Sequence, residues 1–285
     1  MKQQNLYQKL DEKLQEQLRE IAFDYRLTVQ EFYQVVKAAR DLQMWDRESL
    51  PDLWDRWARD TDNKEQLLFR LRRNLQQLRE SETSYEQEIG SPDEPAQKGV
   101  ELRESEKSIF GDCPVASEKT VCCNLRTIDM VENCPMGCSY CSIQTFYHDQ
   151  FVFDENFSAK LNDLDLDSDQ RYHICTGQSS DSLVWGNRFG VLEDLFEFAR
   201  DHPNVSLEFK TKTNNVEYLV ENRVPPNIFC SWSLNPPPVI ENEEHFTASL
   251  TQRLEAARTI ADQGIKVAFH LHPMVYYEGW REDYP

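Results

Sequence analysis

The spacing of apolar residues changes along the chain. Over residues 1–90 they recur every three or four positions, which is the period of an amphipathic helix. Leu6, Leu10, Leu14 and Leu18 form one such stripe, and Ile21 extends it. The pattern predicts that the chain begins with helices.

Polar residues mark where further helices begin. Thr28 followed by Glu31 has the pattern of a capping box, which opens a second predicted helix. Ser49 and Pro51 interrupt the periodicity, and a last helix is predicted from about residue 63 to residue 80. Residues 1–90 are therefore expected to form an all-α helical domain.

This helical domain has two interpretations. A helix-turn-helix or partner-binding module should expose basic residues on one helix. The candidates are Arg70, Arg72, Arg73 and Arg79. A solvated face of a plain helical bundle explains these arginines equally well, and we favour the bundle.

After a polar, turn-rich linker over residues 91–118, strands and helices alternate from residue 119 to residue 285. Short β-branched or alternating runs predict five strands, at residues 121–131, 172–176, 205–211, 228–233 and 266–271. Helical patterns lie between them, at residues 191–198, 216–220 and 250–260. Ser249 with Gln252 caps the last of these helices, Leu254 is expected on its inward face, and Gly264 ends it.

Repeated strand–helix units predict a parallel sheet with ligands at the carboxyl ends of its strands. Several polar or reactive segments fall at those ends: residues 134–141, 177–181, 212, 233–235 and 272–274. A sixth strand is missing from the pattern. We therefore expect an α/β fold whose sheet is incomplete at its C-terminal end. Alternatively, a partner or a missing segment closes the sheet.

Composition narrows the class of protein. The formal net charge is -19, and most of the acidic excess follows residue 100. A field of this sign repels phosphate backbones, which counts against a nucleic-acid substrate. No apolar run approaches the ~18 residues that span a bilayer, and the first residues lack a signal-peptide core. These features predict a cytoplasmic protein without a membrane partner, in a compartment that keeps thiols reduced.

The strongest motif is a cysteine loop after the first predicted strand. Cys134, Cys138 and Cys141 are spaced C-x3-C-x2-C, and Pro135 and Gly137 keep the loop irregular. Three thiolates can hold one side of a metal cluster and leave one position open for chemistry.

A zinc site is the main alternative. It would need a fourth ligand from Cys113, Cys122, Cys123 or His148, but no second C-x2-C pair exists. Outside the loop, His270 and His272 share one strand face and could bind a metal, although interior histidines satisfied by hydrogen bonds are more common.

The cysteine loop resembles the signature of the radical S-adenosylmethionine (SAM) enzymes. In that family three cysteines hold a [4Fe-4S] cluster, and the fourth iron binds S-adenosylmethionine. Cleavage of this cofactor gives a 5′-deoxyadenosyl radical that abstracts hydrogen from substrate. The resemblance implies a partial (β/α)6-type barrel, and a reductant such as flavodoxin or ferredoxin.

Residues 120–285 further resemble spore photoproduct lyase and its relatives, whereas residues 1–100 do not. The matching segments lie at residues 140–145, 180–181, 211–212, 231–235, 239–240, 253–257 and 277–280. The resemblance implies that Cys134, Cys138 and Cys141 are the cluster ligands. It also implies cofactor contacts by residues at the strand ends, namely Gly177, Gln178, Ser180, Lys212, Ser233 and Asn235.

This chain differs from the lyase at two positions that serve the lyase reaction, so resemblance to the family does not by itself imply that reaction. Where the lyase has its hydrogen-donating cysteine, this chain has Gln178, and Cys175 lies three residues earlier. Tyr140 is retained, but Ser142 occupies the position of the second tyrosine of the lyase. Cys175 and Tyr140 are thus the candidate catalytic residues for hydrogen return.

Three functions remain open at this point. The chain could be a DNA-lesion lyase, a radical SAM enzyme with another substrate, or an interaction protein with a degenerate barrel. A flipped lesion base would need an aromatic pocket. Tyr276, Tyr277 and Trp280 are candidates for lining it, although such aromatics more often belong to a core.

Overall fold

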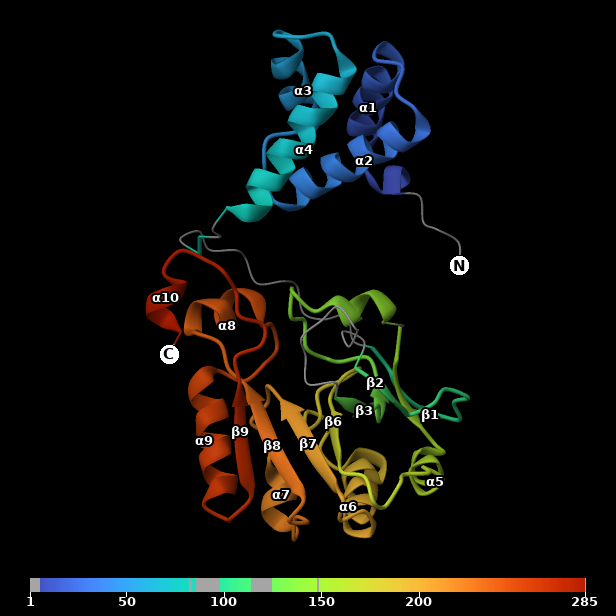
Figure 1. The fold of residues 1–285 in the computed structure, drawn as a ribbon, viewed down its shortest axis with the longest axis vertical. Coiled ribbons are helices and arrows are strands. Elements are labelled where there is room, and N and C mark those ends of the chain that lie inside the picture. Colours follow the sequence, from blue (N-terminus) through green and yellow to red (C-terminus); the bar gives the residue numbers. More distant parts are fainter. Residues whose placement is uncertain (1–5, 82–83, 86–97, 114–124, 148, 285) are drawn as a thin grey trace. The chain divides into compact units, whose positions relative to one another are not determined.

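The computed structural model describes residues 6–81, 84–85, 98–113, 125–147 and 149–284 (Figure 1). The chain divides into two compact units, residues 1–82 and 83–285. Each unit has a hydrophobic core of its own.

The described residues of the first unit form four α-helices. They are α1 (Glu12–Asp24), α2 (Val29–Met44), α3 (Leu50–Ala58) and α4 (Lys64–Glu80), preceded by a 3₁₀ turn over Leu6–Lys9. The predicted capping box is confirmed, because the Thr28 hydroxyl accepts from Glu31 N and the Glu31 carboxylate accepts from Thr28 N. Ser49 caps α3, so the interruption seen in the sequence is a helix start.

The stripe that begins at Leu6 is not one helix. Asp11 accepts a hydrogen bond from Leu14 N at 2.9 Å and so caps α1. This cap separates Leu6 from the helix that carries Leu18 and Ile21. Two of the four arginines of α4 form ion pairs within the unit, Arg70 with Asp60 and Arg79 with Asp41. Such ion pairs are typical of a solvated helix face.

The second unit is built on an open six-stranded sheet (Figure 1). Its strand order is β2 (Phe110–Asp112), β3 (Arg126–Ile128), β6 (Tyr172–Thr176), β7 (Val205–Thr211), β8 (Ile228–Ser233) and β9 (Lys266–His270). The last five strands are parallel and follow the sequence order, whereas β2 pairs antiparallel with β3.

Helices connect the parallel strands and cover one face of the sheet. They are α5 (Phe157–Asn162), α6 (Val191–Asp201), α7 (Glu217–Glu221) and α9 (Leu250–Ala261). Leu207 and Phe209 of β7 join the core with Phe196 and Ile260 of the helices. Because side chains alternate along a strand, Glu208 and Lys210 point to the opposite face.

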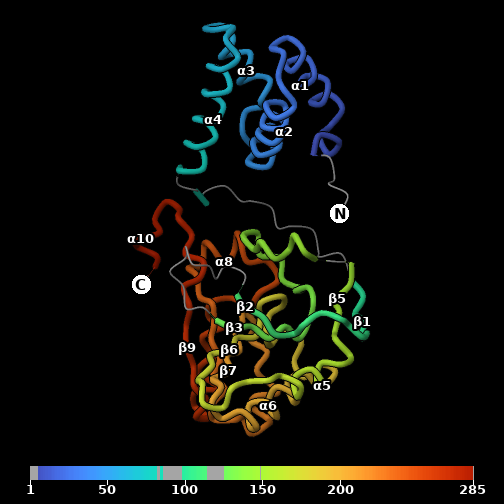
Figure 2. Tube along the Cα trace, turned by 45° about the vertical axis from the view of Figure 1, so that its right-hand side comes forward, coloured from blue at the N-terminus to red at the C-terminus, as the bar shows by residue number. Residues whose placement is uncertain are grey.

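Smaller elements complete the second unit. A separate sheet has the order β1 (Val100–Arg103), β5 (Phe151–Asp154) and β4 (Val131–Glu132), and Figure 2 shows β1 and β5 side by side. Helix α8 (Pro237–Glu243) follows β8, and α10 (Trp280–Asp283) lies near the end of the chain. No helix in the described ranges is long and apolar enough to span a bilayer.

Four predicted strands are confirmed in place, and the first is not. Residues 121–124 of that first strand lie outside the described residues, and its remainder divides into β3 and β4, which belong to different sheets. Strands β1 and β2 lie within the predicted linker. The sheet is not closed, and the structure shows a mixed α/β fold; the finer assignment of a partial barrel stays a prediction.

The inward face of α9 also differs from expectation. Leu254 is 43% exposed, while its neighbour Arg253 is fully buried. The capping box of Ser249 and Gln252 is confirmed, so the helix begins where predicted. Arg253 can be buried because its guanidinium donates hydrogen bonds to Ala248 O, Ser233 O and the Glu244 carboxylate. The periodicity of apolar residues cannot reveal such partners.

Candidate cofactor site

A pocket with a cavity volume of about 110 Å³ lies at the carboxyl ends of β6, β7 and β8. Most of the predicted site residues line it. Its walls comprise Cys134, Met136, Cys138, Tyr140, Cys141, Tyr147, Gly177, Gln178, Ser179, Ser180, Asp181, Lys210, Thr211, Lys212 and Ser233.

The cysteine loop is held against the segment that follows α8. Gly137 N donates to His245 O at 3.1 Å, and Ser139 N donates to Glu243 O at 2.9 Å. A Cβ atom on Gly137 would come within 3.4 Å of His245 and of the Phe246 ring. The loop and this segment therefore approach so closely that glycine fits best at position 137.

The three cysteines of the loop face this one pocket. Burial raises the pKa of Cys134 to about 11 and that of Cys138 to about 12. These two thiols therefore hold their protons at neutral pH until a metal displaces them. Among the residues that the structure describes, no three His, Cys, Asp or Glu side chains are grouped to share a single metal ion.

A cluster would offer a separate iron atom to each of the three thiolates on this pocket wall. Cys122, Cys123 and His148, which were considered as zinc ligands, lie outside the described residues.

Gly177 lets the chain turn sharply at the end of β6. Its φ is +91°, and a Cβ atom there would lie 2.7 Å from Ser182 Oγ and 2.9 Å from Lys210 O. Only glycine adopts this conformation without strain and also leaves this space. The turn brings Gln178 and Ser180 onto the pocket wall.

Asp181, on the pocket wall, links the chain after β6 to the end of β7. Its carboxylate accepts hydrogen bonds from Lys212 N at 2.7 Å, Thr211 Oγ1 at 2.8 Å and Leu183 N at 3.0 Å. Burial raises the pKa of Asp181, and these donors oppose that rise. The bonds fix the backbone from which the Lys212 side chain enters the pocket.

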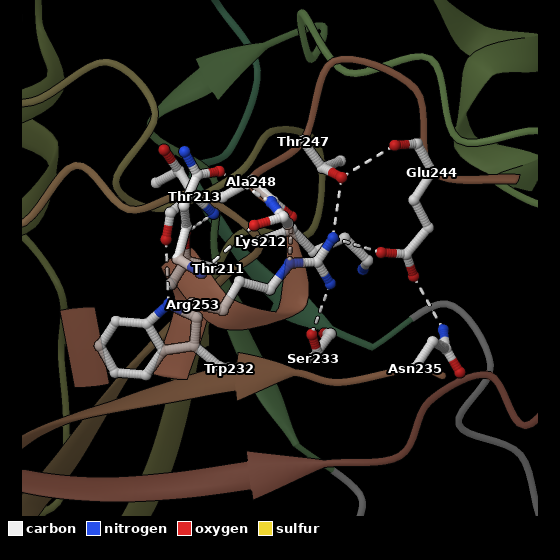
Figure 3. A network of polar contacts seen from close by, with 12 residues as sticks. Thr211, Lys212, Thr213, Trp232, Ser233, Asn235, Glu244, Thr247, Ala248 and Arg253 are labelled. Atoms are coloured by element: carbon white, nitrogen blue, oxygen red, sulfur yellow. Dashed lines mark hydrogen bonds and ion pairs between the residues drawn. The ribbon is translucent and has the colours of Figure 1, made fainter. Parts of the chain in front are cut away.

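A buried polar network lies behind Lys212 and Ser233 (Figure 3). Arg253 donates to Ser233 O at 2.8 Å, to Ala248 O at 2.8 Å and to the Glu244 carboxylate at 2.5 Å. Asn235 Nδ2 donates to Glu244 at 2.8 Å. Asn235 belongs to this network and is not among the residues of the pocket wall.

The two candidate catalytic residues are placed differently. Tyr140 lies on the pocket wall, where its hydroxyl donates to Glu244 Oε1 at 2.5 Å. Burial, followed by the Glu244 charge, raises the pKa of Tyr140 far above its ordinary value. Cys175 is buried on β6, where its thiol donates to Thr176 O, and it does not line the pocket.

Two residues of interest were missed by the sequence analysis. Lys210 of β7 lies two residues before Lys212 and lines the same pocket, as the two-residue period of an extended chain would place it. Glu244 follows α8, a helix that was not predicted. The aromatic residue Tyr277 is buried against Val239 and Tyr284, so it belongs to a small core rather than to a base-binding pocket.

Comparison with known proteins matches the part of the chain that carries this pocket. A family model described as spore photoproduct lyase matches residues 126–285. The spore photoproduct lyase of Clostridium acetobutylicum is 26% identical over 163 residues, which are 55% of this chain and 48% of the relative. The Bacillus subtilis enzyme of the same name is 35% identical over 78 residues, 27% of this chain and 23% of the relative. The chain thus spans about half the length of the first of these relatives and about a quarter of the second.

Solved structures give the same fold. A spore photoproduct lyase variant with bound AdoMet and dinucleoside spore photoproduct superposes with a TM-score of 0.54 at 23% identity, over 71% of this chain and 61% of that one. A complex of the lyase with dinucleoside spore photoproduct gives a TM-score of 0.55 at 21% identity, over 76% and 66%.

A cysteine loop facing a pocket at the carboxyl ends of a parallel sheet, within the matched region, defines a radical SAM protein. More narrowly, the chain belongs to the spore photoproduct lyase family.

Proposed function

We propose that this chain is a radical SAM enzyme that acts on a DNA lesion of the spore photoproduct type. The observation that carries the proposal is the shared pocket, whose wall holds Cys134, Cys138 and Cys141 opposite the strand ends. When bound, a [4Fe-4S] cluster and S-adenosylmethionine would supply a 5′-deoxyadenosyl radical that removes a hydrogen atom from substrate.

Each cysteine of the loop would bind one iron and release its thiol proton. The ammonium of Lys212 would pair with the carboxylate of the cofactor. Ser180 accepts a hydrogen bond from Trp185 Nε1 at 2.9 Å, so its own hydroxyl hydrogen remains for the cofactor. Ser233 and the backbone at Gly177 and Gln178 would complete the polar contacts.

The substrate assignment rests on the family and on local charge. Two of its solved relatives hold a dinucleoside spore photoproduct. Although the chain has a net charge of -19, Lys210 and Lys212 both line the pocket. These two ammonium groups outnumber the one carboxylate of the wall, Asp181, so the pocket has a local positive charge that the overall charge does not reveal.

Cys175 is the candidate hydrogen donor in this scheme. Its thiol donates to Thr176 O at 2.9 Å, and that bond must break for the sulfur to reach a substrate radical. Flavodoxin or ferredoxin would supply the electron. These donors work in a reducing compartment, which we propose to be the cytoplasm.

The test is lesion reversal. Anaerobically reconstituted protein is mixed with S-adenosylmethionine, dithionite and an oligonucleotide that contains one spore photoproduct, and the thymidines are quantified by liquid chromatography. We expect intact thymidines to appear, and an undamaged oligonucleotide to remain unchanged. Formation of 5′-deoxyadenosine at equal rates on both oligonucleotides, with the lesion intact, would show that the substrate is another molecule.

A further inference from the structure

Three parts of the cofactor site meet at the carboxylate of Glu244. Tyr140, from the cysteine loop, donates to Glu244 Oε1 at 2.5 Å. Asn235, which follows β8, donates to the same oxygen at 2.8 Å. Arg253 of α9 donates to the other oxygen at 2.5 Å. Glu244 lies 104 residues after Tyr140, and it does not line the pocket.

Arg253 fixes the carboxylate in place. The side chains of Glu244 and Arg253 are both completely shielded from solvent. The guanidinium also donates to Ser233 O, Ala248 O and Thr247 Oγ1. A planar guanidinium with this many donors engaged has little freedom to move, so Glu244 is held in one orientation.

The ring of Tyr140 contacts the side chain of Lys212. The ammonium of Lys212 lies 5.8 Å from the centre of the Tyr140 ring, within the distance of about 6 Å at which a ring face attracts a cation. Ala248 N, beside the Arg253 contact, donates to Lys212 O at 2.9 Å. Both the backbone and the side chain of Lys212 are therefore tied to the Glu244–Arg253 pair.

We propose that Glu244 is a positioning residue of the cofactor site, which sets the ring of Tyr140 and, through that ring, the ammonium of Lys212. The inference rests on the proposed function, because it takes Lys212 to bind the carboxylate of S-adenosylmethionine. It changes the role of Tyr140. The phenol hydrogen is directed to Glu244, so this residue orients Lys212 instead of passing a hydrogen atom to substrate.

Tyr140→Phe is the most direct variant, because it removes one hydroxyl and keeps the ring. If Glu244 positions the ring, the dissociation constant of S-adenosylmethionine rises by roughly tenfold, which corresponds to about 1.4 kcal/mol. A residue that only relays hydrogen would leave this constant unchanged and would alter only the product. Binding is measured by anaerobic equilibrium dialysis on protein of matched iron content.

Glu244→Gln is the second variant, and Glu241→Gln is its control. Glu241 is exposed on α8, the helix that Glu244 follows, so the control makes the same chemical change away from the network. We expect Glu244→Gln to weaken cofactor binding by at least as much as Tyr140→Phe, and Glu241→Gln to bind as the wild type does. Because Glu244→Gln leaves Arg253 buried without a counter-charge, Tyr140→Phe remains the test if that protein fails to fold.

A double-mutant cycle separates positioning from two independent effects. If the hydroxyl of Tyr140 acts only through Glu244, the double variant binds S-adenosylmethionine no more weakly than Glu244→Gln. The electron paramagnetic resonance spectrum of the reduced cluster gives a second readout, since the cofactor-induced change should be reduced in both variants. Unchanged affinity and spectra in Tyr140→Phe would overturn the inference. Absence of cofactor binding by the wild type would instead reject the proposed function.

Discussion

Glu208 Oε1 lies 2.6 Å from Nε2 of His270, although β7 and β9 are not neighbours in the sheet. The other oxygen, Oε2, lies 2.8 Å from Nε2 of His173 on β6, and Ser231 of β8 donates to Oε1. One buried carboxylate thus joins four parallel strands on the face opposite the helices. Three of these strands, β6, β7 and β8, carry the pocket at their carboxyl ends.

The Glu208 carboxylate should make stability depend on pH. Burial alone would raise its pKa, but hydrogen bonds from His173, His270 and Ser231 outweigh burial and lower it. The unfolded chain takes up a proton near the ordinary glutamate pKa of about 4.3, where folded Glu208 stays ionised. Its stabilising contribution is therefore complete above that pH and is lost as the pH falls below it.

Glu208→Gln tests this contribution. At neutral pH we expect the variant to be less stable by about 1.5–3 kcal/mol, the range for hydrogen bonds to a charged group. Urea unfolding at pH values from about 5.5 down to about 3.5 should show the difference from the wild type shrinking. A difference that stays constant over this range would mean that Glu208 does not titrate below its ordinary pKa.

Gly177→Ala should destabilise the protein more than a matched glycine substitution. Gly177 and Gly190 both have positive φ, +91° and +81°, but only Gly177 has atoms close to the position of a Cβ. We expect Gly190→Ala to cost about 1 kcal/mol of backbone strain, and Gly177→Ala to cost more. Thermal unfolding of both variants measures this. Equal shifts in Tm would show that the packing around Gly177 adapts to a methyl group.

Lys212→Met should weaken the binding of S-adenosylmethionine without changing the iron content. The substitution removes one ammonium that lines the pocket and keeps most of the apolar side chain. We expect the dissociation constant to rise by roughly tenfold to a hundredfold, as for a lost charged hydrogen bond. Lys266→Met is the control, since Lys266 is exposed and donates to Pro226 O. Equal affinities in the two variants would remove Lys212 from the cofactor site.

Much of the parallel sheet could be predicted because its signals are local. The strands at Tyr172–Thr176, Val205–Thr211 and Ile228–Ser233 have the predicted bounds, since each is a short apolar or alternating run between turn residues. The C-x3-C-x2-C spacing likewise predicted that three thiols share one pocket wall, because all three lie within eight residues.

The features that were not predicted from the sequence are those with weak local signals or with partners far away in the chain. Helix α8 begins within a run of prolines, at Pro237, and no capping side chain marks its start. Arg253 occupies a helix face that periodicity assigned to Leu254, because buried carbonyl and carboxylate groups from other elements accept its hydrogen bonds. Strands β1 and β2 are short and carry several polar residues, so they resembled a linker.

The central claim is that the cysteine loop holds an iron–sulfur cluster that cleaves S-adenosylmethionine. The most direct measurement is the yield of 5′-deoxyadenosine from anaerobically reconstituted protein, with S-adenosylmethionine and dithionite. The wild type should be brown, hold roughly four iron atoms per chain, and release 5′-deoxyadenosine. A variant with Cys134, Cys138 and Cys141 replaced by alanine should be colourless and inactive, whereas Cys230→Ala, at a buried thiol outside the pocket, should match the wild type. A colourless wild type, or one that holds iron yet releases no 5′-deoxyadenosine, would contradict the account.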